Sequence, residues 1–84
     1  MPYEVRFSKS AFKDVKELPP KLQKKLKNIV VNQVAQKPSS GKKLVGDLAG
    51  LYSIRLSFKD RIVYTIDEEH KIVYVIRART HYGE

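Results

Sequence analysis

The chain has 84 residues, so we expect residues 1–84 to form one domain. Its 17 Lys and Arg against nine Asp and Glu give a net charge of +8, which favours a polyanionic partner. The absence of cysteine excludes disulfides, thiolate metal sites and cysteine nucleophiles. The N-terminus has no apolar signal region, and the longest apolar run, Ile72–Ile76, is too short to span a membrane. We therefore expect a soluble cytoplasmic protein with no membrane partner.

The N-terminal residues predict a strand followed by a short helix. Tyr3, Val5 and Phe7 alternate with polar residues, which is typical of a half-buried strand. Ser8 or Ser10 is suited to cap the helix that follows. The apolar face of this helix is expected to comprise Ala11, Phe12, Val15 and Leu18.

A second helix is expected after Pro19-Pro20, because proline ends the first helix and suits the first turn of the next. The two helices would form a hairpin. In the second helix, Lys24, Lys25 and Lys27 lie largely outside the apolar face. These lysines fit either a solvated surface or a surface that faces phosphate. Its apolar positions at helical spacing are Leu22, Leu26, Ile29, Val30 and Val34.

After a loop at 37–41 and a turn at 46–50, the pattern is that of strands. Alternating apolar residues mark two strands, at 52–57 and 61–66, and a last strand spans 71–77. A three-residue loop at 58–60 keeps the apolar residues on one face. The pairs in this register are Leu56 with Ile62, Ile54 with Tyr64, and Tyr52 with Ile66.

The predicted fold class is α+β, in the order β-α-α-β-β-β. It is a mostly antiparallel four-stranded sheet with the helical hairpin on one face and a basic opposite face. In the expected register Arg55 is diagonal to Arg61 on the basic face, within reach of one phosphate. The last strand has Ile72, Tyr74 and Ile76 on one side. Its other side, which can coincide with the basic face, carries Val73, Val75, Arg77, Arg79 and His81.

These residue types fit metal-free cleavage of RNA. The 2′-OH of RNA is its own nucleophile, and cleavage needs a base, cations around the phosphorane and an acid for the 5′-oxygen. Arginine binds phosphate in a bidentate manner, and the pKa of histidine suits proton transfer near neutrality. Arg55 and Arg61 are thus candidate phosphate ligands, His81 a candidate acid or base, and Tyr82 a candidate for stacking on a base. The alternative is that these side chains are ordinary surface residues.

No metal ligand pattern is visible, because His70 and His81 fall at opposite ends of the last strand. His70 also sits in an acidic turn. Glycine-rich phosphate loops and Ser-His-Asp signatures are absent too. We therefore expect neither a metal nor a cofactor.

Three segments together resemble the RelE/ParE superfamily of type II toxins. They are the stretch from Lys43 to Leu56, the strand Arg61-Ile62-Val63-Tyr64, and the ending Arg79-Thr80-His81-Tyr82. The similarity covers essentially the whole chain, and the ending looks most like the YoeB-type branch. The resemblance implies an endoribonuclease that cuts mRNA in the ribosomal A site, leaving a 2′,3′-cyclic phosphate and a 5′-hydroxyl. It also implies a cognate antitoxin that forms a hetero-oligomer with the toxin.

By position, the resemblance implies roles for five residues. Arg61 matches the arginine on the scissile phosphate, and Arg55 matches a basic residue of the preceding strand. His81 matches the general acid of the YoeB-type branch. Tyr82 matches its terminal aromatic residue, and Arg79 its companion arginine.

Two departures concern the general base. Where the YoeB-type branch has a glutamate, this chain reads Gly41-Lys42-Lys43, and Ser53 stands where RelE has a catalytic lysine. The base is left unassigned, with Lys42 or Lys43 as substitutes. The residues expected to bind substrate are Lys42, Lys43, Ser53, Arg77 and Arg79. Two alternatives remain open at this point: a ParE-like gyrase inhibitor, and a noncatalytic basic module that binds nucleic acid.

Overall fold

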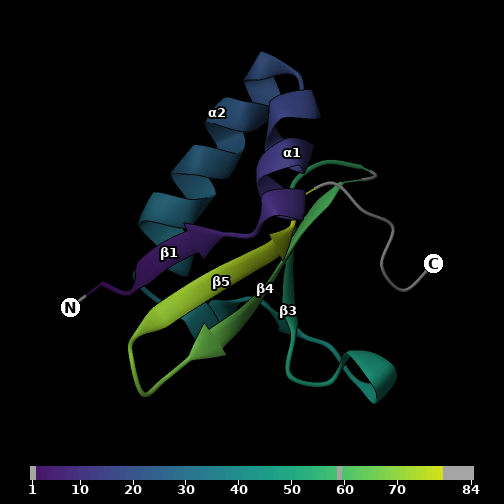
Figure 1. Cartoon of the computed structure of the whole chain (residues 1–84). Coiled ribbons are helices and arrows are strands. Elements are labelled where there is room, and N and C mark those ends of the chain that lie inside the picture. Colours follow the sequence, from purple (N-terminus) through teal and green to yellow (C-terminus); the bar gives the residue numbers. More distant parts are fainter. Residues whose placement is uncertain (1, 59, 79–84) are drawn as a thin grey trace.

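The computed structural model describes residues 2–58 and 60–78. Within these ranges, two α-helices precede most of the strands (Figure 1). The strands are β1 (Glu4–Phe7), β2 (Lys42–Lys43), β3 (Tyr52–Arg55), β4 (Arg61–Asp67) and β5 (Ile72–Arg77). The helices are α1 (Lys9–Glu17) and α2 (Pro20–Ile29), which continues as a π-helical turn at Val30–Val34; short 3-10 turns lie at Pro38–Ser40 and Gly46–Leu48.

The strands form one mixed sheet in the order β1-β5-β4-β3-β2. β1 runs parallel to β5, and the other pairs are antiparallel. The α+β class and the order of the predicted elements are confirmed. The two-residue strand β2 adds a fifth strand to the four expected, because Lys42 and Lys43 pair with β3. The first and last strands are therefore neighbours, although they are far apart in the sequence.

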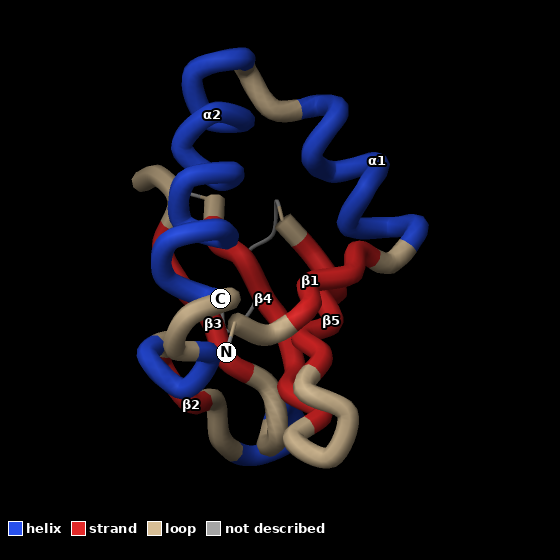
Figure 2. Tube along the Cα trace, turned by 90° about the vertical axis from the view of Figure 1, so that its left-hand side faces the viewer, coloured by secondary structure: helices blue, strands red, loops and turns tan. Residues whose placement is uncertain are grey.

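The two helices lie side by side and pack on one face of the sheet (Figure 2). Side chains from both helices and from alternate positions of the strands form a single core. Its fully buried members include Ala11, Val34, Leu56, Ile62, Tyr64, Val73 and Val75. No helix in the described part of the chain is long and apolar enough to cross a membrane.

Ser8 caps α1, because its Oγ accepts a hydrogen bond from the backbone N–H of Ala11 at 3.0 Å. Proline at the first turn of α2 is also as predicted. The apolar face predicted for α1 is wrong at Phe12, which is 56% exposed beneath the ammonium of Lys16. The inward stripe of α1 contains Asp14 instead, which the structure buries.

The register between β3 and β4 differs from the predicted one by two residues. Tyr52 lies opposite Tyr64, and Ile54 lies opposite Ile62. The assignment of each side chain to a face is confirmed, since a shift of two residues preserves the alternation. The connection is a five-residue loop, 56–60, in which the carbonyl of Asp60 accepts hydrogen bonds from the N–H groups of Leu56 and Ser57. These bonds, which the apolar pattern does not encode, lengthen the loop by two residues, so that pairing on the β3 side ends at Arg55 and not at Ser57.

The alternation predicted for β5 is confirmed, but the side expected to coincide with the basic face is the one that faces the helices. Val73 and Val75 are fully buried on the helix side, whereas Tyr74 is 38% exposed. β5 lies between β1 and β4, and its unbroken apolar run gives no alternation from which the inward face could be read. A bulge between Val63 and Tyr64 in the β4–β5 ladder also changes the register near Arg77.

Candidate nucleic-acid interface

Arg55 and Arg61 lie directly opposite each other on the face of the sheet away from the helices. Their neighbours Ile54 and Ile62 point into the core, so strand alternation directs both arginines outward. Side chains at directly opposed positions have Cβ atoms about 4.5–5.5 Å apart. Arg55 is exposed and Arg61 is half-buried. Two guanidinium groups so placed can bind one phosphate from two sides.

Strand β2 adds one lysine to this face. Lys42 lies opposite Ser53, and Lys43 lies opposite Tyr52. Since opposed residues share a face, Lys42 and Ser53 join the face of the two arginines. Lys43 belongs to the other side of the sheet, with Tyr52. The structure therefore brings together four of the predicted residues: Lys42, Ser53, Arg55 and Arg61. We call these four the basic face.

A buried phenol holds the segment that leads into β2. Tyr64 is fully buried, and its hydroxyl donates a hydrogen bond to the carbonyl oxygen of Pro38 at 2.5 Å. Its ring stacks on Tyr52, with centroids 5.6 Å apart. A Cβ atom at Gly41 would come within 2.3 Å of the Tyr64 hydroxyl, so this position requires glycine. Burial raises the pKa of Tyr64 to about 12, and the phenol stays protonated as a donor.

The loop that joins Arg55 to Arg61 has its own polar anchor. The Ser57 hydroxyl donates to the Asp60 carboxylate at 3.1 Å and accepts from the Asp60 backbone N–H at 3.2 Å. Asp60 is only 6% exposed. These contacts fix the ends of the two strands, and with them the separation of the two arginines. Phe58, at 95% exposure, lies at the outer edge of the same loop.

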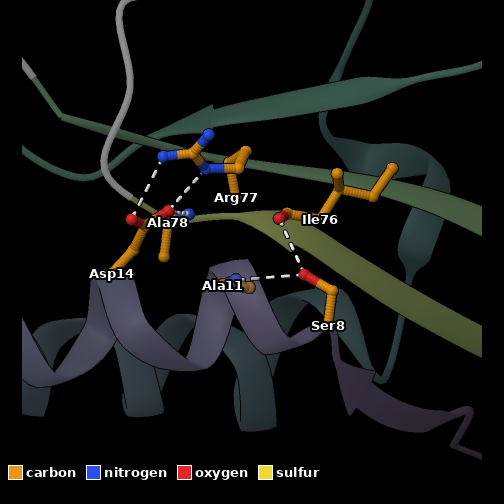
Figure 3. A network of polar contacts seen from close by, with 6 residues as sticks. All are labelled: Ser8, Ala11, Asp14, Ile76, Arg77 and Ala78. Atoms are coloured by element: carbon orange, nitrogen blue, oxygen red, sulfur yellow. Dashed lines mark hydrogen bonds and ion pairs between the residues drawn. The ribbon is translucent and has the colours of Figure 1, made fainter.

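Arg77 contacts α1 (Figure 3). Its Nε and a terminal NH2 group donate hydrogen bonds to the two carboxylate oxygens of Asp14, at 2.7 and 3.2 Å. The backbone N–H of Ala78 donates to the same carboxylate at 3.2 Å. The guanidinium of Arg77 is thus engaged within the fold, and its substrate-binding role stays a prediction. Arg79, His81 and Tyr82 lie outside the described residues.

The other histidine lies in the turn between β4 and β5. The Nδ1 of His70 is 2.9 Å from a carboxylate oxygen of Asp67, and its backbone N–H also contacts that side chain. The hydrogen bond from His70 lowers the pKa of Asp67. His70 therefore has a local partner within its turn. Among residues 2–58 and 60–78, no group of three or more His, Asp or Glu side chains is placed to hold a metal ion.

Sequence reasoning missed Asp14. The only signal was its spacing, since position 14 falls on the same helical stripe as Ala11, Val15 and Leu18. An acidic residue in such a stripe indicates a buried partner of opposite charge. Nothing in the sequence identified Arg77 as that partner, because the two are 63 residues apart.

Comparison with known proteins now places the fold in a class of small bacterial toxins. The family model of ParE-like toxins of type II bacterial toxin–antitoxin systems matches residues 5–83. The chain belongs to this family.

Relatives in sequence and structure bear the names of RelE-type toxins. The chain is 36% identical over 79 residues to toxin RelG of Mycobacterium tuberculosis, covering 93% of this chain and 90% of the relative. It resembles a chain of the M. tuberculosis toxin–antitoxin complex RelBE2, with a TM-score of 0.85, 34% identity and coverage of 94% and 98%. A mutant of Escherichia coli toxin RelE in the free state gives a TM-score of 0.83 at 28% identity, covering 100% of this chain and 88% of that one. The expected family is thereby confirmed.

Proposed function

We propose that this toxin is a ribosome-dependent mRNA endonuclease that needs no metal. The observation that carries the proposal is the direct opposition of Arg55 and Arg61 on the sheet face away from the helices, with Arg55 exposed and Arg61 half-buried. Two permanent cations in this arrangement fit the charge that develops on a phosphodiester during cleavage. Relatives named RelE support the same activity class. The net charge of +8 would assist association with ribosomal and messenger RNA.

In the proposed mechanism the 2′-OH gives up its proton to a base or to solvent and attacks the adjacent phosphorus, and the 5′-oxygen leaves. Arg61 and Arg55 bind the non-bridging oxygens and stabilise the phosphorane. His81 acts as the general acid on the 5′-oxygen, and Tyr82 positions a neighbouring base by stacking. Arg79, Lys42 and Ser53 contribute to binding of the substrate. The products are a 2′,3′-cyclic phosphate and a 5′-hydroxyl.

The direct test is to incubate the purified protein with mRNA, with and without programmed ribosomes, and to determine the cut ends. We expect cuts only with ribosomes, at fixed codon positions, with the two end groups named above. His81→Ala and Arg61→Ala should abolish both cleavage and growth inhibition while the fold stays intact. Toxicity that persists in both variants would reject the site. Stalled gyrase and broken DNA with intact mRNA would identify a gyrase inhibitor instead.

We also propose that a cognate antitoxin binds the helical hairpin. A shallow groove of about 600 Å³ runs along the outer surface of α2 and the turn that follows it. Val31, which is 50% exposed, provides an apolar contact among the lysines. An acidic amphipathic segment fits such a surface by charge and by shape. The groove is lined by Lys21, Lys24, Lys25, Lys27, Asn28, Val31 and Asn32.

The test of this contact uses the cognate antitoxin, to be sought in a small reading frame next to the toxin gene. Reversing the charges with Lys24→Glu and Lys25→Glu should weaken the complex and reduce its association rate. Lys71→Glu, on the turn between β4 and β5, is the control, since it reverses one exposed lysine that does not line the groove. Unchanged affinity of the Lys24/Lys25 variant would exclude α2 as the contact.

A further inference from the structure

The junction between α1 and the end of β5 contains a buried carboxylate. Asp14 is 6% exposed, although it lies on a short helix of a small domain (Figure 3). Its two oxygens accept from both the side chain of Arg77 and the backbone N–H of Ala78. One carboxylate thus fixes the last residue of β5 by its side chain and the next residue by its backbone.

Stability alone does not explain this choice of residue. Burying a carboxylate requires that its lost hydration be replaced, and an apolar residue at the same position often serves a core equally well. The ion pair also fixes the orientation of the chain at Arg77 and Ala78. The planar guanidinium and the backbone N–H can each donate to the carboxylate only within a narrow range of angles. The contact therefore defines the position at which the chain leaves the sheet.

We propose that Asp14 is a positioning residue for RNA cleavage. The inference rests on the proposed function, in which Arg79, His81 and Tyr82 contact the substrate. These residues follow Ala78 within four positions of the sequence. Through Arg77 and Ala78, Asp14 fixes the residues from which the chain continues to the general acid. A general acid must lie within hydrogen-bond reach of its oxygen, so a displacement of about 1 Å is enough to cost up to 100-fold in rate.

Asp14→Asn is the decisive variant, since it keeps the size of the side chain and removes its charge. It should lower kcat for ribosome-dependent mRNA cleavage by about 10- to 100-fold and change KM much less, because Arg55 and Arg61 still bind the phosphate. Arg77→Gln should give a similar loss. The double variant should lose little more than either single variant, because both remove the same contact.

Ser8→Ala is the matched control at the same junction. The Ser8 hydroxyl donates to the carbonyl oxygen of Ile76 at 2.9 Å and caps α1, so its removal leaves the bonds of Asp14 to Arg77 and Ala78 in place. This variant should lower the melting temperature and leave kcat within about twofold of the wild type. Hydrogen exchange at the Ala78 amide should accelerate in Asp14→Asn and stay slow in Ser8→Ala.

These experiments distinguish a failure of the positioning role of Asp14 from a failure of the proposed RNA-cleaving function. If the wild-type protein cuts mRNA and Asp14→Asn retains its kcat, the positioning role is wrong and the proposed function stands. An equal loss of kcat in Ser8→Ala and Asp14→Asn also overturns the positioning role, because general loosening of the junction would then be sufficient. If the wild-type protein cuts no mRNA on ribosomes, the proposed function fails first, and the catalytic role of Asp14 fails with it.

Discussion

Arg55 and Arg61 form a like-charged pair at directly opposed positions of β3 and β4. Among the described residues, neither arginine takes part in an ion pair. Like charges in this position destabilise a sheet, so the pair costs folding free energy. A bound phosphate would reverse the sign of this cost by placing an anion between the two cations. The relationship thus connects the stability of the free protein to its proposed substrate.

Removing either arginine should therefore change stability and activity in opposite directions. Arg55→Ala and Arg61→Ala are each expected to raise the free energy of unfolding by about 0.2–1 kcal/mol, through relief of repulsion. The same variants should lower mRNA cleavage by about 100-fold or more, because a transition-state contact is lost. Urea denaturation and cleavage assays on the same preparations measure the two effects.

Arg6→Ala is the control for this prediction. Arg6 lies on the edge strand β1, which β5 separates from β4, and it pairs with Glu4, so the variant removes one positive charge from the same side of the sheet without touching the opposed pair. We expect cleavage by this variant to stay close to that of the wild type. If it lost as much activity as Arg61→Ala, the effect would reflect net charge and not the opposed pair.

For β3 and β4, the sequence predicted the face of each side chain but not the register of the pairing. Alternation of apolar residues was sufficient to assign Ile54 and Ile62 to the core and both arginines to the opposite face, because alternation depends only on parity. The offset within that parity depends on the loop, where the backbone carbonyl of Asp60 accepts two hydrogen bonds. Such bonds follow from the folded loop and have no apolar signature. The diagonal arrangement predicted for Arg55 and Arg61 was therefore wrong, and the direct one is closer.

The loop offers a contrast between two apolar residues that are two positions apart. Leu56 is fully buried, and Phe58 is 95% exposed. Leu56→Ala should lower the free energy of unfolding by about 2–5 kcal/mol, as expected for a core leucine. Phe58→Ser should change it by no more than about 0.5 kcal/mol. Thermal and urea denaturation would measure both, and a large loss in Phe58→Ser would mean that the loop packs more closely than this structure has it.

For the candidate site, the sequence predicted which residues share a sheet face but not which side chains contact each other across the fold. Ser53, Arg55 and Arg61 were predicted from strand alternation and resemblance, and the structure places them on one face. Arg77 was predicted to share that face, but it pairs with Asp14 on α1. The difference arises because β5 is apolar on both sides, and because the contact joins residues far apart in the chain. Long-range pairs of this kind do not follow from local periodicity.

Gly41 should tolerate no side chain. A Cβ atom there would approach the Tyr64 hydroxyl to 2.3 Å and the carbonyl oxygen of Ser53 to 3.1 Å. The Tyr64 hydroxyl is held by its hydrogen bond to Pro38, and the Ser53 carbonyl belongs to the backbone of β3, so neither atom can move aside easily. Gly41→Ala should therefore lower the free energy of unfolding by about 1–3 kcal/mol through overpacking. Gly46→Ala is a comparison with open space around its Cβ but a φ of +69°, so its loss reports backbone strain alone. A smaller loss for Gly41→Ala than for Gly46→Ala would contradict the close contact.

Tyr64 should make the protein sensitive to alkali. Burial raises the pKa of its phenol from 10.0 to about 12 in the folded state. The protonated phenol therefore contributes stability that is fully present below pH 10 and is lost as the pH rises through about 12. The wild-type free energy of unfolding should fall over this interval. Tyr64→Phe lacks this component, although at neutral pH it should be about 1–3 kcal/mol less stable, because the Pro38 carbonyl loses its donor.

The advantage of the wild type over Tyr64→Phe should consequently shrink as the pH rises above 10. Denaturation by urea at a series of alkaline pH values measures this difference directly. Tyr74→Phe serves as the control, since it removes a partly exposed phenol of the same sheet that does not bind Pro38. It should retain the wild-type alkaline profile. A constant difference between wild type and Tyr64→Phe from neutral to strongly alkaline pH would show that the buried hydrogen bond is not coupled to ionisation of the phenol.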